Sequence, residues 1–467
     1  MLFRRSSTIV RLTVIFLFLM TFGYAPQDLI AASRLSNVTP EMERPGFWIK
    51  KIKNPTNPLL TPEEIGRMNE ENLKRQELGL GRIRDLKGDW SKEEILSLLK
   101  EDWENFGKTE EARYGKNGAP LGEFFWNKLK NNMGREFIQE TSRMFFALIV
   151  KRTDIRIFPT DESSLSAPKQ YEFDYFQQSS ISPGSPIGIY HFSQDKKWAY
   201  VQTQFIRGWI HTDDLAIAKT KAEIVDYEGA KDRLVVTGNF VTVFGDPALR
   251  QRTFTAQMGD SFPLLSGPRG SKETQPFYVI PIPTREDSGP LCIRKGYIRA
   301  DEDVHQGFLP YTQENAARQV FKMLGHPYGW GDRLGGRDCS RLIMDLFRTF
   351  GILMPRNSKE QAMVGMDRGP LEGKPIEEKK RFLDRSVPLA TTLRLPGHIM
   401  LYLGKDRGRH YAIHSIWGIQ KSGKGLQKIG GAVVSDLSLG ENGLNGSLLD
   451  RMTDIRIIGT SDENQEK

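Results

Sequence analysis

The sequence predicts a multidomain α+β protein in which two small all-β modules lie between helical regions. A chain of 467 residues is long enough for several domains of ordinary size. A helical period dominates residues 33–145 and returns after residue 306, whereas short apolar runs with a period of two fill the stretch between them. We therefore expect a helical N-terminal region (33–145), β modules at 146–220 and 221–305, and an α+β domain at 306–467.

The first 32 residues have the form of a secretory signal peptide. Arginines precede an apolar run from Leu12 to Phe22, and small residues follow it. Cleavage near Ala31 or Ala32 is expected, and an uncleaved N-terminal anchor is the alternative. The prediction is an exported protein of the periplasm or cell wall, without a stable membrane span after cleavage. The net charge of +8 suits an anionic wall, although ordinary solvation also explains so small an excess.

Residues 33–145 carry helix-start signals and no catalytic motif. Thr61 with Glu64 and Ser91 with Glu94 each have the spacing of a capping box. The tryptophans of this region are interpreted as core or docking anchors: Trp48, Trp90, Trp103 and Trp126.

The β-rich stretch contains an internal repeat. Ile155 and Phe158 correspond to Val241 and Phe244, and "RGWI" at 207–210 corresponds to "KGYI" at 295–298. Such self-similarity predicts two related all-β modules, each a small barrel or sandwich.

The segment "GRDCSRLIMDLF" at 336–347 places a cysteine at the start of a helix. Leu342, Ile343, Leu346 and Phe347 recur with helical spacing after Cys339. Because a helix N-terminus favours a thiolate, Cys339 is expected to have a lowered pKa and to act as a nucleophile. The alternative is a small apolar core residue.

A cysteine nucleophile needs a base and a group that orients this base. His398 begins the apolar run "HIMLYLG", and His414 lies in the strand-like run "YAIHS". On adjacent antiparallel strands the two imidazoles could meet behind Cys339, although a single strand histidine is more often structural. The second cysteine, Cys292, is expected to be a buried strand residue, because a disulfide to Cys339 would remove the nucleophile. No motif indicates a metal, a cofactor or nucleic-acid binding.

These segments resemble a known family. "GHPYGWGDRLGGRDCSRLIMDLFRTFGILMPRNSKEQA", followed by "GHIMLYLG" and "AIHS", is similar to the catalytic domain of the NlpC family of cell-wall cysteine peptidases, which is papain-like. The likeness spans about 325–417. The β modules resemble bacterial Src-homology-3-like barrels, and the N-terminal region resembles the clip domain found with them.

The resemblance implies roles for individual residues. Cys339 is the expected nucleophile, His398 the general base and His414 the orienting third residue, with His410 as the alternative third residue. Tyr328, Asp338 and Ser340 match substrate-binding positions. The alternative role of Asp338 is that of a helix cap, which is compatible with substrate binding. Two departures from the family pattern, Asp332 and Arg341, stand where glycine is usual and imply a narrower or more charged pocket.

The function implied is a secreted peptidase that cleaves the γ-D-glutamyl to meso-diaminopimelate bond of murein stem peptides or muropeptides with free N-terminal L-Ala. The alternatives are a non-enzymatic wall-binding protein and an amidase or acyltransferase on the same scaffold. The first module is expected to contribute to substrate choice, and these residues are the candidates: Glu172, Asp174, Trp198 and Tyr200. The alternative, favoured for any single one of them, is that the aromatic residues form the core of the module and the acidic residues its solvated face. The oligomeric state stays open.

Overall fold

The structure is a computed structural model that describes residues 35–269, 275–286, 289–421 and 425–459. The predicted signal peptide lies outside these residues. Within them, no helix combines the length and apolar character needed to cross a membrane.

The N-terminal region is largely helical, as expected. Its elements are η1 (Pro40–Glu43), α1 (Pro45–Ile49), β1 (Pro58–Leu60), α2 (Pro62–Lys74), η2 (Gln76–Leu78), η3 (Ile83–Asp85), β2 (Asp89–Ser91), α3 (Lys92–Phe106), α4 (Glu123–Asn132), η4 (Arg135–Phe137) and β3 (Thr141–Arg143). Both predicted capping boxes are present, at Thr61 and at Ser91. Trp48 and Trp126 are buried and Trp90 and Trp103 partly buried, which confirms their reading as anchors.

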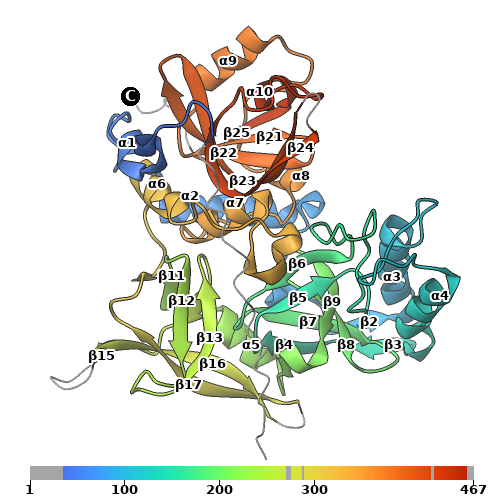
Figure 1. Cartoon of the computed structure of the whole chain (residues 1–467). Coiled ribbons are helices and arrows are strands. Elements are labelled where there is room, and N and C mark those ends of the chain that lie inside the picture. Colours follow the sequence, from blue (N-terminus) through green and yellow to red (C-terminus); the bar gives the residue numbers. More distant parts are fainter. Residues whose placement is uncertain (1–34, 270–274, 287–288, 422–424, 460–467) are drawn as a thin grey trace, which may run out of the picture. The chain divides into compact units, whose positions relative to one another are not determined.

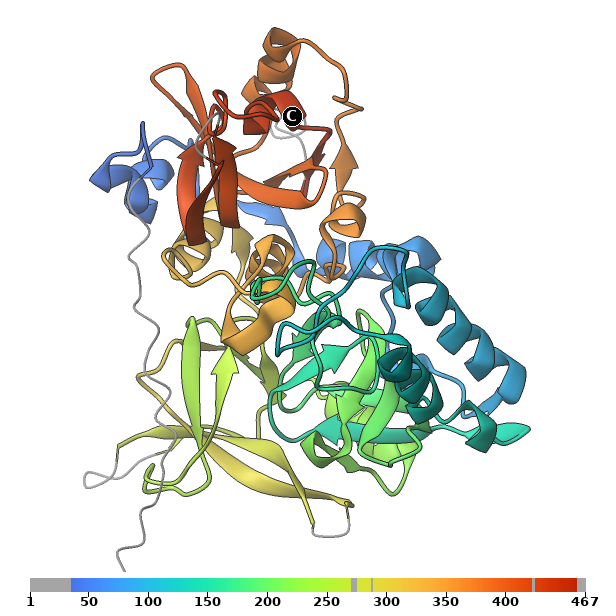
Figure 2. The ribbon, with the colours of Figure 1, turned by 45° about the vertical axis from the view of Figure 1, so that its right-hand side comes forward.

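This region does not form a core of its own. Strand β1 pairs with β19 (Tyr311–Thr312), which opens the α+β part. On α2, Asn69 donates to the carbonyl of Gly351 at 2.8 Å and accepts from the amide of Leu353 at 2.9 Å. Helices α3 and α4 pack instead on the first β module (Figure 2), through a cluster that includes Leu99 and Trp126. The N-terminal region therefore packs against both the α+β part and the first β module.

The first β module is one antiparallel sheet with strand order β10-β4-β7-β8-β9-β5-β6. Its strands are β4 (Phe145–Ile149), β5 (Thr153–Arg156), β6 (Gln177–Ile181), β7 (Pro186–Phe192), β8 (Trp198–Gln202), β9 (Arg207–His211) and β10 (Leu215–Ile217), with η5 (Thr212–Asp214) before β10. Helix α5 (Lys221–Glu228) leads to the second module.

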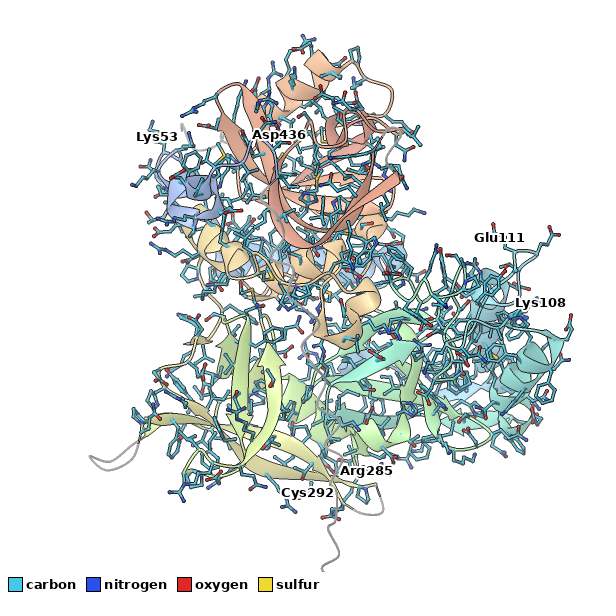
Figure 3. The ribbon with its side chains drawn as sticks, in the orientation of Figure 1. Lys53, Lys108, Glu111, Arg285, Cys292 and Asp436 are labelled. Atoms are coloured by element: carbon cyan, nitrogen blue, oxygen red, sulfur yellow. The ribbon has the colours of Figure 1, made fainter. Side chains whose placement is uncertain are left out.

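The second β module contains two sheets, with orders β14-β11-β18 and β13-β12-β17-β16-β15. Its strands are β11 (Arg233–Val236), β12 (Phe240–Phe244), β13 (Arg252–Gln257), β14 (Ser261–Pro263), β15 (Ser266–Arg269), β16 (Phe277–Arg285), β17 (Leu291–Arg299) and β18 (Val304–Gln306). Cys292 lies on β17, as predicted, but it is only partly buried (Figure 3). It faces the surface because the β16–β17 hairpin extends beyond the core of the module.

The internal repeat corresponds to equivalent strand pairs. Trp209 on β9 pairs with Arg156 on β5, and Tyr297 on β17 pairs with Phe244 on β12. In both modules a glycine precedes the paired aromatic residue, and a Cβ there would clash with a side-chain methyl of a neighbouring strand, at 2.7 Å from Ile155 for Gly208 and at a still shorter distance from Ile282 for Gly296. Only glycine allows these strands to cross so closely, which explains why "RG" and "KG" recur.

The α+β part places helices before a six-stranded antiparallel sheet, which confirms the predicted fold class (Figure 1). The helical elements are α6 (Gln313–Phe321), η6 (Trp330–Gly335), α7 (Cys339–Arg348), α8 (Ser358–Gln361), α9 (Ile376–Asp384) and α10 (Leu448–Arg451). The sheet has order β20-β25-β21-β22-β23-β24, with β20 (Met366–Asp367), β21 (Thr391–Leu395), β22 (His398–Asp406), β23 (Arg409–Lys421), β24 (Gly425–Asp436) and β25 (Asp454–Ile457).

Helix α7 is buried on every side. Its predicted apolar face packs on β22 and β23 in one core with Ile399 and Ile413. The opposite face carries Arg341 and Asp345, which are 1% and 0% exposed, because the two β modules cover it (Figure 1). The apolar period predicted the contact of α7 with the sheet, but not the contact of its charged face with the β modules.

Buried histidines predict a loss of stability in mild acid. Burial lowers the pKa of His191 and His410 to about 4 and that of His398 to about 3. The unfolded chain binds these protons near pH 6.5, so their stabilising effect is complete above this pH and is lost as the pH falls towards 4. We expect the free energy of unfolding, measured by urea denaturation, to be lower at pH 5 than at pH 7 by about 1–2 kcal/mol for each histidine. His191→Gln should reduce this difference.

Candidate active site

Cys339 is the first residue of α7, as predicted, and only 8% of it is exposed. Asp338 caps the helix by accepting the amide of Arg341 at 2.8 Å. Burial raises the pKa of the Cys339 thiol to about 12, and the negative charge of Asp338 raises it further, against the lowering effect of the Ile399 and Ser340 amides. The expected low thiol pKa is therefore wrong, because desolvation outweighs the helix terminus.

His398 begins β22 and His414 lies on the neighbouring strand β23, so the predicted strand positions hold. The His398 Nε2 atom lies 2.7 Å from His414 Nδ1, and His414 Nε2 lies 2.8 Å from the hydroxyl of Ser435 on β24. The rings and the hydroxyl thus form a hydrogen-bonded row across three strands. His410 is not part of it, since its Nδ1 atom contacts the Tyr402 hydroxyl at 2.8 Å.

Ser435 is a member of this row that the sequence did not reveal. It is fully buried, and nothing in its neighbourhood "VVSDL" distinguishes it from an ordinary strand serine. The register of β23 and β24, in which His414 pairs with Val433, brings Ser435 next to the imidazole. Strand register is a tertiary property that local sequence rarely specifies.

Burial favours the uncharged forms of His398 and His414. Burial lowers the pKa of His398 to about 3 and that of His414 well below its usual value. At neutral pH, the His398 imidazole and the Cys339 thiol are therefore both uncharged.

The other predicted residues gather at the same helix start. Tyr328 lines the cleft with Asp338 and Ser340, and burial raises the pKa of its phenol. The carboxylate of Asp338 is already bound by both terminal nitrogens of Arg356, at 2.7 and 3.1 Å. Ser340 donates to Asp338 at 3.1 Å and accepts from Arg356 at 2.8 Å. Arg356 therefore holds both candidate binding groups in place.

The two departures from the family pattern explain each other. Arg341 donates to Asp332 at 2.9 Å and to the carbonyl of Ser180 on the first module at 3.2 Å. Asp332 adopts a φ of 64°, a left-handed conformation that glycine and aspartate tolerate best. It also accepts from the hydroxyl of Ser179 at 2.9 Å. The pair neither narrows the cleft nor charges it, because it is buried between α7 and the first module.

A second set of contacts ties α7 to the second module. Arg337 and Gln257 both donate to one oxygen of Asp345, at 2.8 and 2.7 Å, and Arg337 also contacts Asn239 at 2.5 Å. Burial alone would raise the pKa of Asp345, but Arg341 and Arg337 lower it to about 2. Helix α7 is thus held by hydrogen bonds from charged side chains to both modules.

A cleft of about 680 Å³ lies over Cys339. Its lining from the N-terminal region is Gln76, Glu77, Leu78, Gly79, Glu101, Asp102, Asn105, Phe106, Gly107, Thr109 and Arg113. Its lining from the first module is Ile157, Ser164, Tyr175, Gln177, Gln178, Gln202, Phe205, Ile206 and Arg207. Three parts of the chain therefore build this cleft.

The four candidates named for the first module are not those that line the cleft. Asp174 is buried in an ion pair with Arg156 at 2.8 Å, and Trp198 and Tyr200 are core residues, 3% and 0% exposed. Glu172 is exposed outside the cleft. The substrate role was therefore wrong for these residues. The alternative is confirmed for Trp198 and Tyr200 as core residues and for Glu172 as a solvated one, whereas Asp174 is buried in its ion pair.

Comparison with known proteins agrees with this geometry. Residues 325–424 match the NlpC/P60 family, and residues 163–211 match the SH3 domain of SH3b1 type. Cys339, His398 and His414 all fall within the first match. Residues 325–424 form an NlpC/P60 domain.

Solved structures of NlpC/P60 proteins are similar to this chain. A novel NlpC/P60 endopeptidase from Photobacterium damselae subsp. piscicida is 19% identical, with a TM-score of 0.69, over 89% of this chain and 97% of its own. An NlpC/P60 family protein from Bacillus cereus is 14% identical over 61% of this chain and 83% of its own, with a TM-score of 0.42. No curated protein matches the sequence. The papain-like NlpC/P60 fold with an SH3b module is thereby confirmed, and the family is one of cysteine peptidases.

Proposed function

We propose that this NlpC/P60 protein is an exported cysteine endopeptidase that cleaves the γ-D-glutamyl to meso-diaminopimelate bond of murein stem peptides. The observation that carries the proposal is Cys339 in the cleft at the start of α7, with its thiol at the amide of Ile399, the residue after His398, which in turn bonds to His414. The signal-like N-terminus supports export to the periplasm or cell wall. The division into a clip-like region, two barrels and a peptidase domain is part of the same proposal.

The proposed reaction begins with a neutral thiol and a neutral imidazole. The Cys339 sulfur attacks the amide carbon while its proton passes to His398, and the Cys339 amide stabilises the oxyanion. His398 then gives the proton to the leaving amine, and water hydrolyses the thioester. His414 accepts from His398 Nε2 and so keeps the other ring nitrogen of His398 available as the base.

Mass spectrometry of products from defined muropeptides tests the proposal. The expected products are L-Ala-γ-D-Glu and a peptide that begins with diaminopimelate. Release of the whole stem peptide would support an amidase instead, and transfer to an added amine an acyltransferase. Binding to sacculi without any cleavage would favour the non-enzymatic alternative.

Replacement of Ser435 should slow the reaction by changing the protonation of the histidine pair. If Ser435 accepts the Nε2 proton of His414, then Nδ1 of His414 is the acceptor that His398 needs. Ser435→Ala leaves this buried N–H without a partner, at a cost of about 1–3 kcal/mol, and so favours the other tautomer. We expect kcat to fall about 10–100-fold with KM little changed.

Conservative replacement provides the control. Ser435→Thr retains the hydroxyl and should restore most of the activity. Nitrogen-15 spectra of the histidine rings should show the tautomer change in Ser435→Ala alone. Equal kcat values for Ser435→Ala and the wild type would exclude this role.

A further inference from the structure

Among the described residues that line the cleft, the cationic side chains are Arg113, Arg207 and Arg356. Arg207 is neutralised by Glu101 and Asp102, each at 2.8 Å. Arg356 is neutralised by Asp338 at 2.7 Å and by Asp332 at 3.1 Å. These two guanidinium groups are therefore occupied by the protein's own carboxylates.

Arg113 differs from both. The ion pair recorded for it joins its Nη2 atom to Glu111 at 3.5 Å, and the Glu111 side chain is 81% exposed, whereas that of Arg113 is 17% exposed. Figure 3 shows Glu111 on the loop between α3 and α4, with its side chain at the surface. An exposed ion pair of this kind contributes little free energy, so Glu111 compensates the charge of Arg113 only weakly. Among the described residues, this carboxylate of Glu111, at 3.5 Å, is the side-chain acceptor recorded for the Arg113 guanidinium.

An aromatic ring fixes the orientation of this guanidinium. The central carbon of the Arg113 group lies 4.2 Å from the ring centroid of Tyr175, which belongs to the first module. The Tyr175 ring lies 6.4 Å from that of Trp330, on the loop before Cys339, and both rings line the cleft. Stacking covers one face of the guanidinium and leaves its N–H edges for a planar acceptor.

We propose that Arg113 and Tyr175 form a carboxylate subsite of the cleft, which binds an ionised carboxylate of the peptide substrate. A guanidinium held by an aromatic ring matches the two oxygens of a carboxylate, and the underpaired charge is partly desolvated. The inference rests on the proposed function. A peptide bonded through the γ-carboxyl of glutamate retains a free α-carboxylate. Diaminopimelate carries two more, one at the C-terminus and one on its side chain, so the substrate offers this group three times.

The consequence is that the N-terminal region takes part in substrate choice. Arg113 comes from that region, Tyr175 from the first module and Trp330 from the NlpC/P60 domain. The subsite exists only where these three parts meet.

Paired substrates test the subsite. The wild type and Arg113→Gln are compared on the tripeptide, on the tripeptide with the glutamyl α-carboxylate amidated, and on the tripeptide with both diaminopimelate carboxylates amidated. Arg113→Gln should lower kcat/KM about 10–100-fold on the unmodified peptide, mainly through KM. On the peptide that lacks the recognised carboxylate, wild type and variant should be equal, and this arm identifies the carboxylate.

Three further variants sharpen the comparison. Arg113→Lys keeps the charge without the planar fork, so its value should be intermediate. Glu111→Gln should leave the substrate preference unchanged, because this carboxylate is exposed. Arg143→Gln, an exposed arginine on β3 outside the cleft, should behave like the wild type.

Equal losses on all three peptides, or no loss on any, would overturn the subsite. Peptide binding to Cys339→Ala, measured by calorimetry with and without the Arg113→Gln change, does not depend on which bond is cleaved. A proposed reaction that fails can thus be separated from a proposed subsite that fails. If Arg113→Gln does not fold, the Arg113→Lys series decides in the same way.

Discussion

Cys339→Ala should abolish peptide hydrolysis, with a loss of at least about 10⁴-fold in kcat. The thiol supplies the bond-forming atom, and no other described cysteine lies in the cleft. His398 and His414 remain, but without the sulfur they have no nucleophile to deprotonate. Turnover of the tripeptide by purified protein, followed by chromatography of the products, is the measurement.

The fold should survive this change. The replacement removes one sulfur atom from a position that is still 8% exposed, so the cavity it leaves is small. A thermal midpoint within a few degrees of the wild type is expected, together with unchanged peptide binding. Cys292→Ala is the matched control and should keep full activity, because Cys292 lies on β17 of the second module. Near wild-type turnover by folded Cys339→Ala would exclude the mechanism.

Arg341→Met should destabilise the protein by about 3–5 kcal/mol, the usual cost of removing one partner from a buried ionic network. The change leaves Asp332 and Asp345, both fully buried, with one cation fewer. It also removes the donor to the Ser180 carbonyl, and so loosens the contact between α7 and the first module. The thermal midpoint should fall by about 3–6 °C.

A second substitution tests the cause of this loss. In the double variant Arg341→Met with Asp332→Gly, the uncompensated carboxylate is removed and glycine accepts the left-handed φ, so the midpoint should partly recover. Arg318→Met is the control, since the Arg318–Glu314 pair is exposed on a helix and should contribute less than about 1 kcal/mol. A double variant less stable than Arg341→Met alone would show that Asp332 is not the source of the penalty.

The buried contacts between the arginines near α7 and the β modules also affect experiments on an isolated α+β fragment. A fragment that begins near residue 306 would expose Arg337, Arg341 and Arg356 without their partners on the modules. Its behaviour would report the loss of these contacts as well as the loss of substrate selection. Point variants in the full chain therefore separate the two effects better.

The sequence by itself determined the elements whose signals are local. The apolar period after Cys339 predicted α7, the capping boxes predicted the starts of α2 and α3, and His398 and His414 were placed on strands. Helix caps and apolar periods act over a few residues, so a chain carries them without reference to its fold. The signal peptide, the barrel nature of the second module and the bond cleaved stay predictions.

Only the tertiary structure decided the character of the site. Burial between the sheet and the two modules raised the pKa of Cys339, where the helix terminus alone predicted the opposite. Strand register brought Ser435 to His414, and the meeting of three parts brought Arg113 to the cleft. Partners such as Arg341 and Ser180 are 161 positions apart. Desolvation and charge pairing depend on which groups the folded chain brings together, and no local pattern of residues encodes that.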